Sequence, residues 1–179
     1  TQTDSFPIYL KQYIKNDVLK VMANGSLNYT VKGICMGMKV TWNYMPPVHG
    51  GDTFTSIKKG SKATLKIVQN KENGFIKELY IQKVQNTENA TFKTQLEKTI
   101  KELQDTYPFL SIKERNNGLY LIDIPQACRS GHEAHFSKVA KTFLHYLQYK
   151  DMPEWENENT ISKYYITTTA VEMAKSRDK

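Results

Sequence analysis

Residues 34–44, ICMGMKVTWNY, decide the fold class of this chain. Large apolar or aromatic side chains occupy every second position, and smaller or polar side chains lie between them. Successive side chains of a β-strand point to opposite faces of a sheet. This period of two therefore predicts a long strand with one apolar face and one mixed face. Trp42 and Tyr44 fall on the apolar face, where packing in a core is the expected role.

Turn signals on both sides of this strand divide the chain into further strands. Asn24-Gly25 lies between two strand-like runs and predicts a hairpin. After the long strand, residues 45–52 (MPPVHGGD) break the alternation and predict a loop. The pattern predicts strands at residues 18–23, 26–31, 53–58, 63–68 and 78–83, and a second hairpin of residues 110–115 and 119–124 around Asn116-Asn117-Gly118.

Three stretches show helical periodicity. In residues 89–107, apolar side chains are spaced by three or four positions and form one stripe, which ends before Pro108. Residues 131–149 and 158–175 predict two more helices, separated by Pro153. Hairpins followed by helices predict one α+β domain over residues 1–179, with a largely antiparallel open sheet and helices packed on one face. We expect a partner surface to cover the other face.

Composition excludes several classes of protein. The formal charge is +7, but only three of the 25 basic residues are arginine, so no nucleic acid is expected as a partner. Two distant cysteines form neither a disulfide framework nor a thiolate metal site. No stretch predicts a membrane span or a secretory leader. We expect a soluble cytoplasmic or periplasmic protein, excised from a longer polypeptide because the chain begins with Thr1.

Residues 129–136, RSGHEAHF, hold the first candidate site. Ser130 and Glu133 have the spacing of a helix capping box. Alternatively, Arg129, His132 and His135 face a substrate. A metal site would need a third ligand, because His132 and His135 are three residues apart, where a zinc-protease helix needs four. His49 or Asp52 could supply that ligand, but we assign no metal.

The loop after the long strand holds the second candidate site. His49 and Asp52 lie there beside two glycines, and loops carry function more often than cores do. The alternative is a long turn in which Asp52 bonds its own backbone. No nucleophile elbow, phosphate-binding loop or dinucleotide-binding glycine motif occurs in the chain. The candidate substrate-binding residues are His49, Asp52, Arg129, His132 and His135.

Residues 40–69, VTWNYMPPVHGGDTFTSIKKGSKATLKIVQ, together with GHEAHFSKVAKTFLHYLQ and MPEWENENTISKYYITTTAVEMAK, resemble a known family. They are similar to the C-terminal domain of oxidoreductases of the Gfo/Idh/MocA (glucose–fructose oxidoreductase / inositol dehydrogenase) family, in the subgroup common in Bacteroidetes. The resemblance implies an N-terminal Rossmann domain that binds NAD(P). It also implies that this α+β domain covers a sugar-like substrate and forms a homo-oligomer through its open sheet face.

The catalytic motifs of that family are not in this chain. Its usual lysine lies in an E-K-P motif of the N-terminal domain, and its D-x-x-x-H pair has no counterpart here. The resemblance therefore implies no catalytic and no cofactor-binding residue in this chain. The expected function is the substrate-covering and oligomerisation domain of an NAD(P)-dependent oxidoreductase of sugars or polyols. A non-catalytic carbohydrate-binding or assembly module is the alternative, and a small metal enzyme around His49, His132 and His135 is a third.

Overall fold

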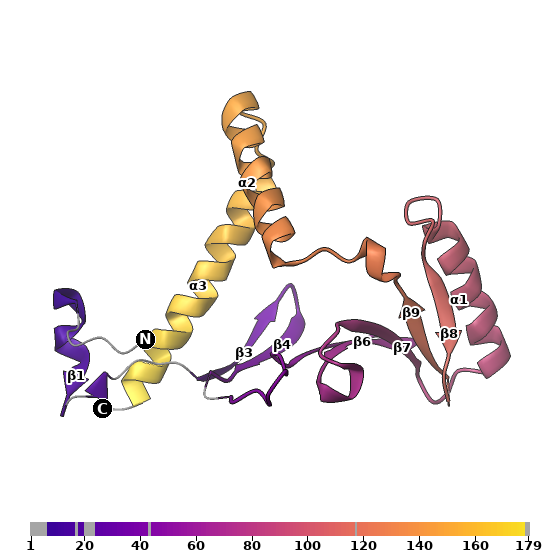
Figure 1. Ribbon diagram of the computed structural model, residues 1–179, viewed down its shortest axis with the longest axis horizontal. Coiled ribbons are helices and arrows are strands. Elements are labelled where there is room, and N and C mark those ends of the chain that lie inside the picture. The colour runs from indigo at the N-terminus through magenta and orange to yellow at the C-terminus, as the bar shows by residue number, and fades with distance from the viewer. Residues whose placement is uncertain (1–6, 17, 20–23, 43, 117, 178–179) are drawn as a thin grey trace. The chain divides into compact units, whose positions relative to one another are not determined.

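A computed structural model describes residues 7–16, 18–19, 24–42, 44–116 and 118–177 (Figure 1). The chain forms two compact units. One, here called the terminal unit, consists of Thr1–Met45 and Asp151–Lys179. The other, the sheet unit, is Pro46–Lys150.

The sheet unit is built on a five-stranded antiparallel sheet in the order β5-β6-β7-β9-β8. Neighbouring strands run antiparallel throughout, and short turns join several of them, such as the turn that Gly60 N–H closes on the Ala63 carbonyl at 2.9 Å. The predicted antiparallel α+β class is confirmed. The strands are β5 (Phe54–Lys59), β6 (Ala63–Gln69), β7 (Glu78–Lys83), β8 (Ser111–Glu114) and β9 (Leu119–Asp123).

Helix α1 (Asn89–Leu103) packs on one face of this sheet and forms the core with it (Figure 1). Leu96 and Ile100 lie on the predicted apolar stripe and are buried against Tyr120 and Ile122 of β9. The two β9 residues are two positions apart, so both face α1. Surrounding side chains complete the core: Leu79, Ile81, Phe92, Leu110, Ile112 and Ile124.

The end of α1 differs from the prediction. The helix ends at Leu103 instead of residue 107, and a turn follows. Tyr107 immediately precedes Pro108, and the proline ring sterically disfavours the helical conformation of the residue before it. Both Leu103 and Tyr107 are consequently left exposed, although they belong to the same stripe in the sequence.

The opposite face of the sheet is more polar. The row of directly paired residues across the sheet contains Lys66, Tyr80, Leu121 and Lys113, which alternate with the residues that face α1. Leu121 is buried, whereas Lys113 forms an exposed ion pair with Asp123 at 2.7 Å. A solvent-exposed ion pair of this kind contributes little stability.

In the terminal unit, β3 (Gly25–Val31) and β4 (Ile34–Val40) form a hairpin. The alternating stretch is thus a strand, although it ends at Val40 instead of residue 44. The expected core packing of Trp42 and Tyr44 was wrong, because both lie beyond the strand and are exposed. The turn is Lys32-Gly33, where both residues have positive φ as a type I′ turn requires. The prediction that Asn24-Gly25 forms the turn was wrong. Gly25 begins β3, and the Asn24 side chain accepts a hydrogen bond from Trp42 N–H at 2.7 Å.

The remaining elements lie near the two ends of the chain. A 3-10 helix η1 (Ile8–Tyr13) precedes the strands β1 (Ile14–Lys15) and β2 (Val18–Leu19), which pair with each other. Residues 20–23 of the predicted first strand lie outside the described part of the chain.

Two long helices follow the sheet strands. Helix α2 (His132–Tyr149) belongs to the sheet unit, and α3 (Glu154–Arg177) belongs to the terminal unit. Helix α3 begins directly after Pro153, four residues earlier than predicted. The two glutamates in its first turn interact favourably with the positive N-terminal end of the helix dipole. None of the described helices is long and apolar enough to cross a membrane.

Candidate functional site

Three segments of the sheet unit meet at one end of the five-stranded sheet, here called the loop end. The strand register places Phe54 opposite Gln69, and Val68 opposite Glu78. Strands β5 and β7 therefore begin at this end, where β6 and β9 finish. The loop before β5, the turn between β6 and β7, and the connector after β9 all lie there. They contain His49, Asp52 and Arg129, three of the predicted substrate-binding residues.

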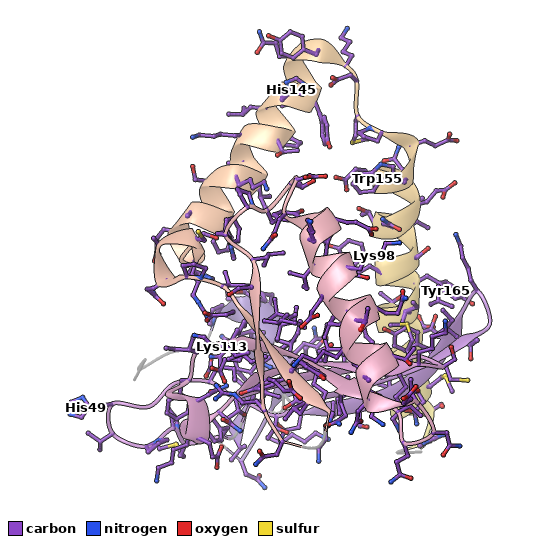
Figure 2. The ribbon with its side chains drawn as sticks, turned by 90° about the vertical axis from the view of Figure 1, so that its right-hand side faces the viewer. His49, Lys98, Lys113, His145, Trp155 and Tyr165 are labelled. Atoms are coloured by element: carbon purple, nitrogen blue, oxygen red, sulfur yellow. The ribbon has the colours of Figure 1, made fainter. Side chains whose placement is uncertain are left out.

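The loop before β5 is held by its backbone and presents His49 at its tip (Figure 2). Gly50 N–H donates to the Pro47 carbonyl at 2.7 Å, and His49 has a φ of 61°. A positive φ is uncommon outside glycine, although histidine is among the residues enriched there. Lower in the loop, Gln69 Nε2 donates to the backbone carbonyl of Asp52 at 2.9 Å, and Asp52 itself is exposed.

The turn between β6 and β7 supports this loop. Within it, the short helix η2 (Lys71–Asn73) is capped reciprocally, because Asn70 and Asn73 each accept the other's backbone N–H. Phe75 follows with a φ of 59°, and its N–H donates to the Asn70 carbonyl at 2.7 Å. An added Cβ on Gly51 would lie 3.3 Å from the Phe75 Cβ, so the loop backbone passes close to this ring.

Arg129 joins the connector after β9 to the start of β7. Its Nε donates to the Ile124 carbonyl at 3.1 Å, and its Nη1 donates to the Lys77 carbonyl at 2.8 Å. Lys77 in turn places its ammonium group 5.1 Å from the centre of the Phe54 ring. Because Phe54 begins β5, two residues after Asp52, Arg129 is linked through Lys77 to the strand that follows the His49 loop.

The start of α2 corrects one sequence interpretation. The N-cap is Gly131, and no side chain caps the helix, so the predicted capping box of Ser130 and Glu133 was wrong. The Ser130 hydroxyl is instead hydrogen-bonded to His135 Nε2 at 2.6 Å. His132 packs edge-on against the Phe136 ring, with centroids 4.7 Å apart. The His135 ring lies about one turn into the helix, within hydrogen-bonding reach of the Ser130 hydroxyl.

One perturbed ionisable group lies beside the loop end. The Tyr80 hydroxyl donates to Glu78 Oε2 at 2.6 Å, and this hydrogen bond, with burial, raises the pKa of Tyr80 above its ordinary value. Burial likewise raises the pKa of Tyr120 in the core. The neutral form of both phenols is therefore favoured, and the hydrogen bond to the Glu78 carboxylate orients the Tyr80 hydroxyl.

The predicted residues form two groups. His49, Asp52 and Arg129 lie on segments of the loop end, whereas His132 and His135 lie on the first turn of α2. Within the described part of the chain, no hydrogen bond or ion pair joins the side chains of the two groups. Among all residues that the structure describes, no group of three or more histidine, cysteine or acidic side chains could hold a metal ion.

Sequence reasoning missed the residues that hold the loop end together. Gln69, Phe75 and Lys77 act through a backbone carbonyl, a ring contact and a cation–ring contact. The sequence signal available was the turn Glu72-Asn73-Gly74, which predicts a turn but not its partners.

Comparisons with known proteins fit this fold. Residues 1–175 match the family model described as "Putative oxidoreductase C terminal domain". Among solved structures, the chain is similar to a protein described as a putative oxidoreductase from Parabacteroides merdae ATCC 43184, at 40% sequence identity and with a TM-score of 0.89. The match covers 98% of this chain and 40% of that chain, so this chain spans less than half the length of that relative. The comparison with curated proteins found no match.

The family match extends over nearly the whole chain and agrees with the antiparallel sheet and its flanking helix. The chain belongs to the family of putative oxidoreductase C-terminal domains.

Proposed function

We propose that this chain covers the substrate in a longer NAD(P)-dependent oxidoreductase of the Gfo/Idh/MocA type that acts on a sugar or polyol. The observation that carries the proposal is the loop end of the sheet, where three separate segments bring polar groups to one place. Family membership and the longer relative support a further domain on the same polypeptide. The sugar, the cofactor and the subgroup are parts of the proposal.

The chemistry of the loop end suits a polyhydroxylated molecule. The exposed Asp52 carboxylate accepts hydrogen bonds, and the His49 ring can donate one and accept one. The guanidinium group of Arg129 has five N–H donors. One on Nε and one on Nη1 already donate to backbone carbonyls. Its first role is therefore to hold the connector in place, and a contact with substrate would use the remaining donors. His132 and His135 would contact substrate only if it also reached the start of α2.

The residues of this chain do not fit a dinucleotide. Phosphate-binding motifs place a glycine-rich turn between a strand and a helix. Helix α2 follows a connector with one glycine, Gly131, and α1 follows Glu88, whose carboxylate would repel a phosphate. The proposed NAD(P) would therefore bind in the preceding domain and supply hydride transfer there. This chain would bind and orient the other reactant and exclude water from it.

The sheet face opposite α1 is the proposed oligomer surface. Ile57 is exposed there beside Lys66, and the row continues with Tyr80, the buried Leu121 and Lys113. Assembly through this face would therefore depend on ionic strength more than an apolar interface does. Sedimentation of the longer polypeptide at low and high salt would measure this directly.

The proposal is tested in the longer enzyme with single alanine variants of His49, Asp52, Arg129, His132 and His135. Loss of a hydrogen bond to a charged group is expected to lower kcat/KM for a sugar substrate by about 10-fold or more. Asp105→Asn, an exposed acidic residue beyond the end of α1, serves as the control. Unchanged kcat and KM in all five variants would rule out a substrate-covering role for these residues.

A further inference from the structure

Within the sheet unit, helix α2 carries a broad apolar stripe that is largely exposed. The helix spans 18 residues and buries none of them. Side chains three, four and seven positions apart lie on one face of a helix. The members of this face, here called the α2 stripe, are Phe136, Val139, Phe143, Leu144 and Leu147, which are exposed by 64%, 68%, 59%, 61% and 59% respectively.

The rest of α2 is polar, as expected of a helix with one docking face. Lys138 and Lys141 lie on the far side from the stripe, as does His145, which Figure 2 labels near the C-terminal end of the helix. The residues of α2 with partial burial are Thr142 and Tyr146. At 100° per residue both fall on one flank of the stripe. The two partly buried residues therefore lie beside the stripe, and the centre of the stripe stays exposed.

The exposed area is too large to be incidental. A phenylalanine side chain buries roughly 150–250 Å² when covered, so Phe136 and Phe143 alone expose about 250 Å². Three aliphatic side chains extend the patch. Monomeric proteins rarely leave contiguous apolar patches larger than a few hundred Å² exposed without a partner. Contacts between domains of one chain typically bury about 600–1,500 Å². The size of the stripe is therefore that of one side of such a contact.

We infer that the α2 stripe is the docking surface for the preceding region of the longer polypeptide. The Parabacteroides merdae protein has this fold over 98% of the present chain, yet the chain accounts for only 40% of that protein. A family of C-terminal domains implies a region before it on the same polypeptide. A tethered region is present at a high effective concentration, so it outcompetes a separate molecule for the same surface.

The expected partner surface has a definite chemistry. It is a concave apolar patch that receives Phe136 and Phe143 and is rimmed by polar groups. An apolar centre with a polar rim is the usual anatomy of a protein interface. The inference rests on the longer polypeptide that the proposed function also requires. It does not depend on the sugar or on the nicotinamide cofactor.

Hydroxyl-radical footprinting of the intact longer polypeptide tests the inference. Oxidation of Phe136, Phe143 and Leu147 is compared between the native and the urea-unfolded polypeptide, with exposed Tyr107 as the internal reference. Burial in an interface is expected to lower oxidation of the stripe by at least about tenfold, while Tyr107 stays reactive. Stripe residues that react as fast as Tyr107 in the native polypeptide would overturn the inference.

Two variants separate the docking face from the polar face. Phe143→Asp is expected to restore oxidation of Phe136 and Leu147, whereas Lys141→Asp, on the other side of the same helix, leaves them protected. If Phe143→Asp does not fold, Leu147→Ser provides the milder test, with the same expectation for Phe136. Restored oxidation in Lys141→Asp to the same extent would also count against the inference.

The terminal unit and a second copy of the chain are the competing occupants. Footprints of the present chain without the preceding region address the first, because protection of the stripe there assigns it to the terminal unit and overturns the inference. For the second, footprints are taken above and below the concentration at which sedimentation shows any oligomer to dissociate. Protection that disappears on dilution assigns the stripe to a second copy and overturns the inference. Protection that persists in a polypeptide without oxidoreductase activity leaves the inference intact and counts against the proposed function instead.

Discussion

Truncation of Leu96 to alanine is the sharpest test of the core described above. Leu96 is 8% exposed and packs from α1 onto Tyr120 and Ile122. Leu103 lies on the same helix and the same sequence stripe but is 41% exposed. Leu96→Ala and Leu103→Ala remove identical atoms and change helix propensity in the same direction, so their difference isolates burial.

The expected magnitudes follow from these exposures. Full burial of a leucine side chain contributes about 1.5–3 kcal/mol, of which Leu96 retains nearly all and Leu103 somewhat more than half. Only Leu96→Ala also leaves a cavity in the core, which brings large-to-small changes to about 2–5 kcal/mol. We expect a loss of about 3 kcal/mol in the unfolding free energy of the sheet unit for Leu96→Ala and about 1 kcal/mol for Leu103→Ala.

The assay must report on the sheet unit. Both tryptophans, Trp42 and Trp155, belong to the terminal unit, so their fluorescence follows the wrong part of the chain. Native-state hydrogen exchange of the β9 segment, residues 119–123, reports on the core directly. Exchange there is expected to accelerate about 100-fold in Leu96→Ala and about fivefold in Leu103→Ala. Equal acceleration in the two variants would refute the assignment of Leu96 to the core and of Leu103 to the surface.

Two further perturbations test the loop end and the neighbouring tyrosine. Gly50→Ala would place a Cβ 2.7 Å from the Pro47 ring and carbonyl, a backbone overlap expected to cost about 1–3 kcal/mol and to speed proteolysis of residues 46–53. Gly25→Ala meets nothing within 4 Å and is the control; equal proteolysis of both variants contradicts the loop geometry. Because the Glu78 hydrogen bond raises the pKa of Tyr80, the folded state favours the neutral phenol. Its stabilising contribution is complete below about pH 10, the ordinary tyrosine pKa, and is lost as the pH rises through the higher folded pKa. Tyr80→Phe should therefore weaken the fall in unfolding free energy at high pH, measured by urea titration; an unchanged fall contradicts the pKa shift.

Periodicity in the sequence predicted the elements because the side chains on one face of a strand or helix recur at a fixed spacing in residue order, even in β4, where none of them is buried. The alternation from Ile34 to Val40 predicted β4, and the spacing of Leu96 and Ile100 predicted the buried face of α1. Local signals were less reliable where two of them competed. Asn24-Gly25 and Lys32-Gly33 both permit a tight turn. Pairing that places Leu27 and Tyr29 opposite Met38 and Met36 keeps every apolar side chain on one face, which selects the second turn.

For the candidate site, the sequence supplied residue types and the tertiary structure supplied their partners. His49, Asp52 and Arg129 could be selected because polar groups beside glycines, or at a helix start, are common in functional loops. Their placement at one end of the sheet could not be predicted, because the bond from Arg129 to the Lys77 carbonyl joins residues 52 positions apart. The failed cap at Ser130 has a local cause instead, since the imidazole of His135, five positions further on, bonds the serine hydroxyl.

The sequence by itself therefore determined most of the strands, the helices and the antiparallel α+β class, since each follows from a regular spacing of apolar residues along the chain or from a local turn signal. Only the tertiary structure decided which loops meet at the loop end, and that α2 buries none of its apolar residues. Both depend on register and packing between distant segments, and residue order does not encode those distances locally.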